Sequence, residues 1–180
     1  KNYYGEKSAV YYKELIEQAN RYDLWRNDIE RVAYYDSLAV QVSQNAFGID
    51  SEEYVNSLSG YLFSLRRQNK YHKALSLCND YFSATDSTNV FSHKIYNQAA
   101  MCYKSLGMNE PAVISFIKAI DKVDDRNTKS LYAVNLSSLL VDENNEKVAL
   151  DFLDKYEPKT DNPIDHYTFL NTKANILANI

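Results

Sequence analysis

Apolar residues along this chain recur three and four positions apart, the spacing that places them on one face of an α-helix. The clearest stretch has an aromatic residue, two small residues and a tyrosine, followed by Ala-x3-Phe and a further alanine; these residues are Tyr96, Ala99, Ala100, Tyr103, Ala112, Phe116 and Ala119. Gly107 lies between the two halves and suits the left-handed residue that commonly ends a helix. The segment therefore predicts two helices joined by a short turn, and its small residues allow them to pack closely.

The same spacing recurs along the chain. Nine residues separate the last core position of a first helix from the alanine of the next helix, at Leu65–Ala74, Tyr103–Ala112 and Leu140–Ala149. The first-helix position itself recurs after 38 residues at Tyr103, after 37 more at Leu140, and after a further 37 at Leu177. A nearly constant period of this length is typical of helical hairpins that stack side by side.

The N-terminal fifty residues follow the pattern less closely. The nine-residue spacing from Ile16 to Trp25 predicts a second helix that includes Trp25 and runs to about Gln44. Lys13 and Trp25 are large where small residues are expected. Because terminal units of a stack are often atypical, we interpret this part as an N-terminal cap.

The pattern resembles the tetratricopeptide repeat, whose units combine aromatic and small residues in the first helix with Ala-x3-Phe in the second. The resemblance implies an all-α fold, a right-handed solenoid of antiparallel helix hairpins. It divides one continuous domain into an atypical hairpin, three repeats and the first helix of a partial repeat, at 1–50, 51–88, 89–126, 127–161 and 162–180.

Composition agrees with helices rather than sheets. The chain has only 4 Gly and 3 Pro, against about 13 and about 9 for average usage, so tight turns are few. The net charge of −4 and the absence of a basic stretch argue against a nucleic-acid partner. No apolar run reaches the length of a membrane span, which argues against direct membrane insertion.

The compartment stays open. The chain begins at Lys1 without a methionine, so we interpret it as a processed protein or an excised piece. If it is excised from a membrane-anchored protein, a periplasmic or other extracytoplasmic location follows; otherwise it is cytoplasmic.

No grouping of reactive residues predicts catalysis. A nucleophile, a base and an orienting group would have to stand together, whereas His72, His93 and His166 are scattered and are expected to lie on the surface. None has a second His or Cys at metal-ligand spacing. The sequence therefore predicts a protein that is not an enzyme and has no metal and no cofactor. Cys78 and Cys102 are expected to be buried free thiols; a disulfide between them is the alternative outside the cytoplasm.

The resemblance implies that the first helix of each unit lines a concave surface that binds partners. On each first helix the stripe facing this groove is offset from the packing residues, which gives Asn56, Ser59, Phe63, Arg66, Lys94, Asn97, Met101, Lys104 and Ser138, with Val134 and Val141 beside the last. Three cations on an acidic protein suggest an acidic or C-terminal peptide segment as ligand; ordinary solvated side chains are the alternative. Some relatives clamp a terminal carboxylate, but Ser59, Phe63 and Gln98 depart from that arrangement.

The leading hypothesis for function is a non-catalytic scaffold that binds a protein or peptide on its concave face. The alternative is a sensory or regulatory segment of a larger bacterial receptor, transcription regulator or lipoprotein. The last helix has no partner helix within the sequence, so we also expect a homodimer through it.

Overall fold

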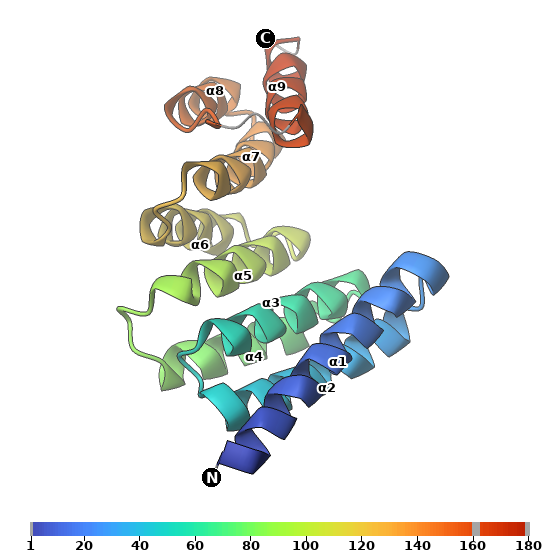
Figure 1. Cartoon of the computed structure of the whole chain (residues 1–180). Helices are drawn as coiled ribbons and strands as arrows, with labels where there is room; N and C mark the ends of the chain where they lie inside the picture. Colours follow the sequence, from blue (N-terminus) through green and yellow to red (C-terminus); the bar gives the residue numbers. More distant parts are fainter. Residues whose placement is uncertain (1, 160–162, 179–180) are drawn as a thin grey trace.

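The computed structural model describes residues 2–159 and 163–178. These residues form nine α-helices and one short 3-10 turn, with no strand among them. The helices are α1 Asn2–Arg26, α2 Ile29–Phe47, α3 Glu52–Arg67, α4 Tyr71–Ala84, α5 His93–Ser105, α6 Asn109–Lys122, α7 Arg126–Asp142, α8 Glu146–Lys155 and α9 Pro163–Leu177, and the 3-10 turn is Val90–Ser92. They stack in chain order as antiparallel hairpins (Figure 1), which confirms the predicted all-α solenoid. The expected start of the partial repeat at residue 162 lies outside the described residues.

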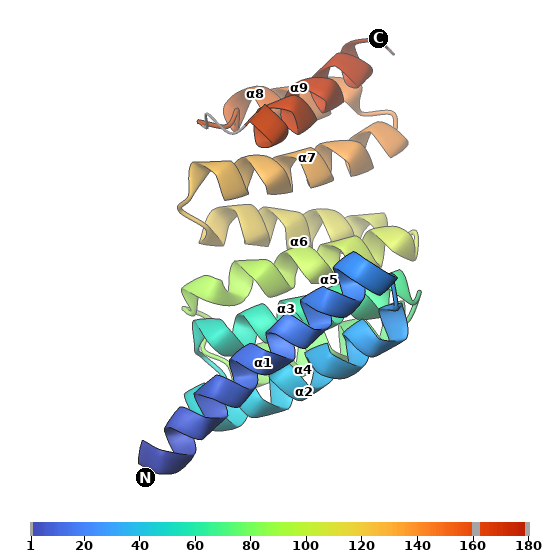
Figure 2. The ribbon, with the colours of Figure 1, turned by 45° about the vertical axis from the view of Figure 1, so that its right-hand side comes forward.

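The stack has two unlike faces. Neighbouring odd-numbered helices contact one another from α3 to α5, from α5 to α7 and from α7 to α9. In contrast, no Cα atoms of α2 and α4, of α4 and α6, or of α6 and α8 come within 8 Å of one another. Because the odd-numbered helices lie closer together, they form the inner side of the curved stack, and Figure 2 shows them following one another along it. We call the surface of α3, α5, α7 and α9 on this side the inner face.

Buried alanines set the distance between helices. The second helix of each unit begins with Ala-x3 and a larger residue, and all six residues of these pairs are 0 % exposed: Ala74, Cys78, Ala112, Phe116, Ala149 and Leu153. Small side chains at a crossing let two helices approach closely, and the larger residue one turn later fills the space beside it. The Ala-x3 spacing found in the sequence therefore marks positions that are buried in the core.

The turns between paired helices are built alike. Asn69, Gly107 and Asn144 follow α3, α5 and α7, and all three have left-handed backbones with φ of 58°, 69° and 57°. In each turn the next residue donates its backbone N–H to the core residue of the first helix at 2.9 Å: Lys70 to Leu65, Met108 to Tyr103 and Asn145 to Leu140. Glycine and asparagine tolerate this backbone best, which explains which residue types end these helices.

The N-terminal hairpin differs from its prediction. α1 continues through Trp25, which is 84 % exposed, so the expected second helix containing Trp25 is wrong. The turn falls at Asn27 and Asp28 because the first residue adopts a left-handed backbone and the second caps the next helix. Asn27 is left-handed (φ 46°), and the Asp28 carboxylate accepts the backbone N–H of Arg31 at 3.1 Å to cap α2.

Polar side chains fasten this hairpin to the rest of the stack. No Cα atom of α1 lies within 8 Å of α3, yet Arg67 of α3 is bonded to Asp23 of α1. At the junction of α2 and α3, the buried Ser64 hydroxyl donates to Asp36 Oδ2 at 2.5 Å. The terminal unit is thus held by α2 and by long side chains rather than by close contact of first helices.

Two leucines of α7 differ in burial, which predicts that their substitution by alanine lowers the free energy of unfolding by different amounts. Leu136 is 0 % exposed and Leu131 is 53 % exposed. We expect Leu136→Ala to lower the free energy of unfolding by about 2–5 kcal/mol, because it removes packed methyl groups and leaves a cavity. Leu131→Ala is the matched control and should change it by roughly 0.5 kcal/mol or less. Urea denaturation followed by circular dichroism measures both, and equal losses would contradict the assignment of the core.

Candidate functional site

The residues that the sequence predicted for binding lie on three of the first helices. Asn56, Ser59, Phe63 and Arg66 lie on α3, Lys94, Asn97, Met101 and Lys104 on α5, and Ser138 on α7. Two pairs of them bond directly across neighbouring helices, Asn56 with Lys94 and Lys104 with Ser138, and Ser59, Arg66 and Asn97 are joined to the next helix through Gln98 or Asn135. The surface is therefore a connected polar network with a few apolar side chains in it, rather than a set of independent solvated residues.

Lys94 is neutralised within the protein. Its Nζ donates to Asn56 Oδ1 at 2.5 Å and forms an ion pair with Glu52 Oε1 at 3.4 Å. The lysine on α5 thus bonds to two side chains of α3, and its charge is balanced by a carboxylate that a ligand would have to displace.

Lys104 is paired in the same way on the other side of α5. Its Nζ donates to Ser138 Oγ at 2.7 Å and lies 3.1 Å from Asp142 Oδ2. Nearby, Asn135 Nδ2 donates to Asn97 Oδ1 at 3.2 Å. These bonds join α5 to α7 and leave Lys104 with a carboxylate of its own.

Arg66 differs from the two lysines. Its Nη1 donates to Gln98 Oε1 at 2.8 Å, and Gln98 Nε2 donates to Ser59 Oγ at 3.3 Å. Its Nε is buried without a hydrogen-bond partner, and no carboxylate of the described residues forms an ion pair with it. Burial lowers the pKa of Arg66, as expected for a charge removed from water without a counter-charge.

Phe63 stands beside this charge. Its side chain is 45 % exposed, and the guanidinium carbons of Arg66 and Arg67 lie 5.7 and 5.8 Å from its ring centroid. A guanidinium at this distance is attracted to the face of an aromatic ring. The two arginines therefore lie beside the Phe63 ring, which remains accessible on α3.

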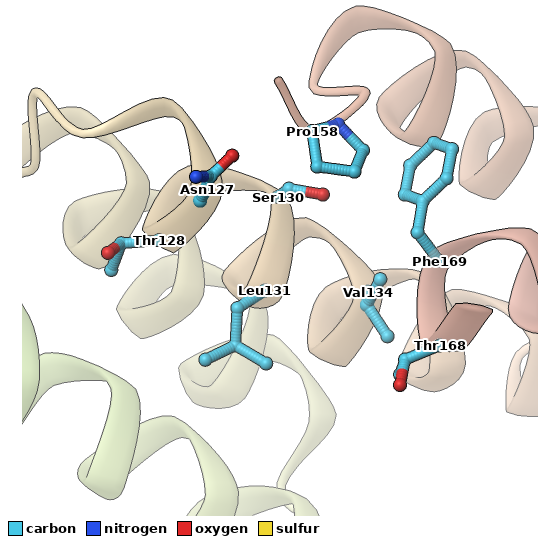
Figure 3. A pocket seen from close by; sticks show the side chains of 8 residues that line it. All are labelled: Asn127, Thr128, Ser130, Leu131, Val134, Pro158, Thr168 and Phe169. Carbon is cyan, nitrogen blue, oxygen red and sulfur yellow. The ribbon is translucent and has the colours of Figure 1, made fainter. Parts of the chain in front are cut away.

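Two hollows open between α7 and α9. The first has a volume of about 200 Å³ and is lined by Asn127, Thr128, Ser130, Leu131, Val134, Pro158, Thr168 and Phe169. Figure 3 shows Pro158 and Phe169 across from Leu131 and Val134. The second, of about 240 Å³, is lined by Ser138, Val141, Asp142, Thr172, Asn175 and Ile176. The first has no ionisable side chain in its lining, so it offers apolar and neutral polar contacts only.

Comparison with known proteins identifies the fold. No protein-family model matches the chain, and no curated protein sequence matches it. Among solved structures, the TPR-like repeats of a putative kinesin light chain from Podosopora anserina superpose with a TM-score of 0.69 at 11% identity, over 92% of this chain and 85% of that one. The fold is a TPR-like helical repeat.

Two further structures agree with that assignment. A tetratricopeptide repeat protein from Parabacteroides merdae has a TM-score of 0.58 at 18% identity, over 93% of this chain and 60% of that one. BtubC from P. vanneervenii has a TM-score of 0.57 at 15% identity, over 89% and 61%. The predicted resemblance to tetratricopeptide repeats is thus confirmed at the level of the fold.

The TPR-like period explains which side chains meet. The bonds Asn56–Lys94, Ser59–Gln98 and Asn97–Asn135 join residues 38, 39 and 38 positions apart. Asn56 and Lys94 occupy the same place in successive repeats, and each of the other two pairs is offset from it by one position. Sequence reasoning missed the partners Glu52, Gln98 and Asp142. A search one period away from Lys104 would have reached Val141, next to Asp142, whereas Glu52 and Gln98 lie four and six positions from the equivalents of Lys94 and Arg66.

His93 is not the surface residue that the sequence suggested. It begins α5 and its Nδ1 lies 2.8 Å from the hydroxyl of Tyr132 on α7. Burial, together with the nearby Lys94, lowers the pKa of His93 to about 4, and burial raises the pKa of Tyr132. The pair joins two first helices of the TPR-like stack and keeps His93 neutral at pH 7.

Other reactive groups in the described part of the chain are dispersed or inert. No three His, Cys, Asp or Glu side chains come together there as metal ligands would. Cys78 and Cys102 are free and buried, and burial raises the pKa of Cys102 to about 11 and that of Cys78 further. None of the described helices is both long enough and apolar enough to cross a membrane.

The His93–Tyr132 contact predicts a pH dependence of stability. The pKa of His93 is lower in the folded protein, about 4, than the ordinary value of 6.5. The unfolded chain therefore binds the proton first, and stability should be lost as the pH falls from 6.5 towards 4. We expect His93→Gln to reduce this loss and His72→Gln, at an exposed position, to leave it unchanged. Denaturant midpoints measured across this range would contradict the assignment if the two variants behaved alike.

Proposed function

We propose that this TPR-like protein is a non-catalytic scaffold that binds an acidic protein segment along its inner face. The observation that carries the proposal is Arg66, a partly buried cation without a carboxylate partner, next to the exposed ring of Phe63. Stacked helical repeats commonly present such a surface to extended ligands.

Of the three cations that suggested an acidic ligand, Arg66 is the one best placed to bind a ligand carboxylate. Lys94 and Lys104 already have Glu52 and Asp142 as partners, so a ligand carboxylate gains little there. Arg66 uses Nη1 to reach Gln98, and its Nη2 makes no hydrogen bond to the described residues. A carboxylate accepting from Nη2 would supply the missing counter-charge, and such charge-assisted bonds are stronger than neutral ones.

Apolar contacts extend from this point along the face. Phe63 on α3 and Met101 on α5 stand one period apart. Leu131 and Val134, which line the first hollow, lie about one to two turns nearer the start of α7 than Ser138, the equivalent of Met101. Packed helices lie about 8–10 Å apart, and an extended chain rises about 3.3 Å per residue. A bound extended segment would therefore meet a new helix roughly every third residue, with an acidic residue near Arg66.

The same arrangement supports a role without catalysis. The strongly shifted groups are His93, Tyr132 and the two thiols, and each is buried in a contact between helices. The first hollow has no ionisable lining residue. Perturbed groups gathered around a cavity would favour an enzyme, and the described residues do not gather in that way.

Selection from a random peptide library tests the proposal. We expect peptides selected on the parent protein to share an acidic residue about three positions from an apolar one. Arg66→Met keeps much of the side-chain volume and removes the charge, and should weaken a selected peptide at least about tenfold, in line with the loss of a charged hydrogen bond. Phe63→Ala should weaken it by a similar factor. Fluorescence anisotropy measures both affinities.

Two matched controls separate the inner face from general effects. Arg21→Met removes an exposed arginine that pairs with Glu17 on α1, and Leu24→Ala removes an exposed apolar side chain there. Both variants should bind the peptides as the parent does. Peptides that bind all four folded variants equally well would overturn the proposal, as would a library that yields no acidic preference.

A further inference from the structure

Arg66 and Lys104 occupy the same place in successive repeats, 38 residues apart and close to the ends of α3 and α5. Lys104 forms an ion pair with Asp142 of the following first helix. One period of 37 residues before Asp142 stands Ser105, whose hydroxyl donates to the backbone carbonyl of Met101 within α5 at 3.0 Å. The repeat thus keeps the cation at the junction of α3 and α5 and has no carboxylate at the equivalent position.

Gln98 provides the acceptor for Arg66 at this junction. Its Oε1 accepts from Arg66 Nη1 at 2.8 Å, the kind of contact that a carboxylate oxygen also makes. The amide carries no charge, so it satisfies one N–H of the guanidinium and leaves the positive charge uncompensated. Because an ionised acceptor binds a guanidinium more strongly than a neutral one, glutamine is the weaker of two partners with nearly the same shape.

The orientation of the Gln98 amide is fixed from both ends. A guanidinium only donates hydrogen bonds, so the amide oxygen faces Arg66. The amide nitrogen donates to Ser59 Oγ at 3.3 Å. Ser59 and Arg66 lie about two turns apart on α3, and one side chain of α5 therefore bridges them. The guanidinium held in this way lies 5.7 Å from the ring centroid of Phe63.

The surroundings of Arg66 make its missing counter-charge important. The side chain is partly buried, and its Nε makes no hydrogen bond. Charges that are partly removed from water interact more strongly than fully exposed ones, because the surrounding medium screens them less. An incoming carboxylate therefore gains more at Arg66 than at a solvated arginine, provided that no acid of the protein already occupies it.

We propose that Gln98 is the positioning residue that makes the inner face selective for a carboxylate. It holds Arg66 in place as a neutral acceptor and so leaves the positive charge to the ligand. A carboxylate at position 98 would occupy Arg66 internally, as Asp142 occupies Lys104. This inference rests on the proposed function, because it names the residue that sets the ligand preference of the same site.

Exchange of the amide for a carboxylate tests the role of Gln98. Gln98→Glu keeps the shape of the side chain, and the Ser59 hydroxyl can rotate to donate to the new oxygen. The probes are a peptide selected on the parent protein and the same peptide with its acidic residue changed to the corresponding amide. The parent should bind the acidic form at least about tenfold more tightly, and in Gln98→Glu this ratio should fall to about one.

The affinity ratio separates selectivity from a merely structural effect. A variant that only disturbs the helices weakens both peptides together and keeps their ratio, whereas Gln98→Glu should weaken the acidic form alone. Gln41→Glu is the matched control, since it adds the same charge at an exposed position of α2. It should keep the ratio of the parent. Fluorescence anisotropy measures the affinities, and circular dichroism checks the fold of each variant.

Urea denaturation shows whether the new carboxylate reaches the guanidinium. Gln98→Glu should give a higher urea midpoint when Arg66 is present than in the Arg66→Met background, where the carboxylate has no partner. Equal shifts of the midpoint in the two backgrounds would overturn the inference, because position 98 would then not act through Arg66.

The outcomes distinguish this inference from the proposed function. A parent protein that binds the acidic and amide peptides equally well overturns both, and it does so without any variant at position 98. A parent that prefers the acidic peptide, together with a folded Gln98→Glu variant that keeps the same ratio, leaves the proposed function standing and overturns the role of Gln98.

Discussion

Close approach of two helices at a buried alanine is the contact on which the rest of this structure depends. Ala74, Ala112 and Ala149 occupy it in three successive units, and none has any exposed surface. A larger side chain there would separate the helices of a hairpin and with them the layers stacked above and below, since the core runs continuously through the array. The nearly constant period preserves this contact from unit to unit and therefore sets the geometry of the inner face.

The inner face follows from that period. Side chains one repeat apart meet on adjacent first helices, so the polar groups of α3, α5 and α7 are largely satisfied by one another. Lys94 and Lys104 belong to this internal network. Arg66 is the cation of the three that lacks a carboxylate, and it lies beside Phe63. Under the proposed function, the carboxylate of an acidic ligand is therefore expected at Arg66.

The two ends of the described stack depart from the repeat in different ways. At the N-terminal end, no Cα atom of α1 lies within 8 Å of α3, and the long side chain of Arg67 reaches Asp23 of α1. At the other end, α9 keeps the repeat spacing on the side that its predecessors bury, and so presents a second apolar stripe.

The sequence by itself determined the helices from α3 onward, the period and the left-handed turn at Gly107. These features depend on local spacing, which is visible along the chain. Only the tertiary structure decided the turn at Asn27, the partners of Lys94 and Lys104, and the burial of His93 against Tyr132. Each of these depends on groups brought together from different helices, or on a choice between competing turn sites that propensity leaves open. The physical reason is that hydrogen bonding and desolvation act between neighbours in space, which local periodicity alone does not specify.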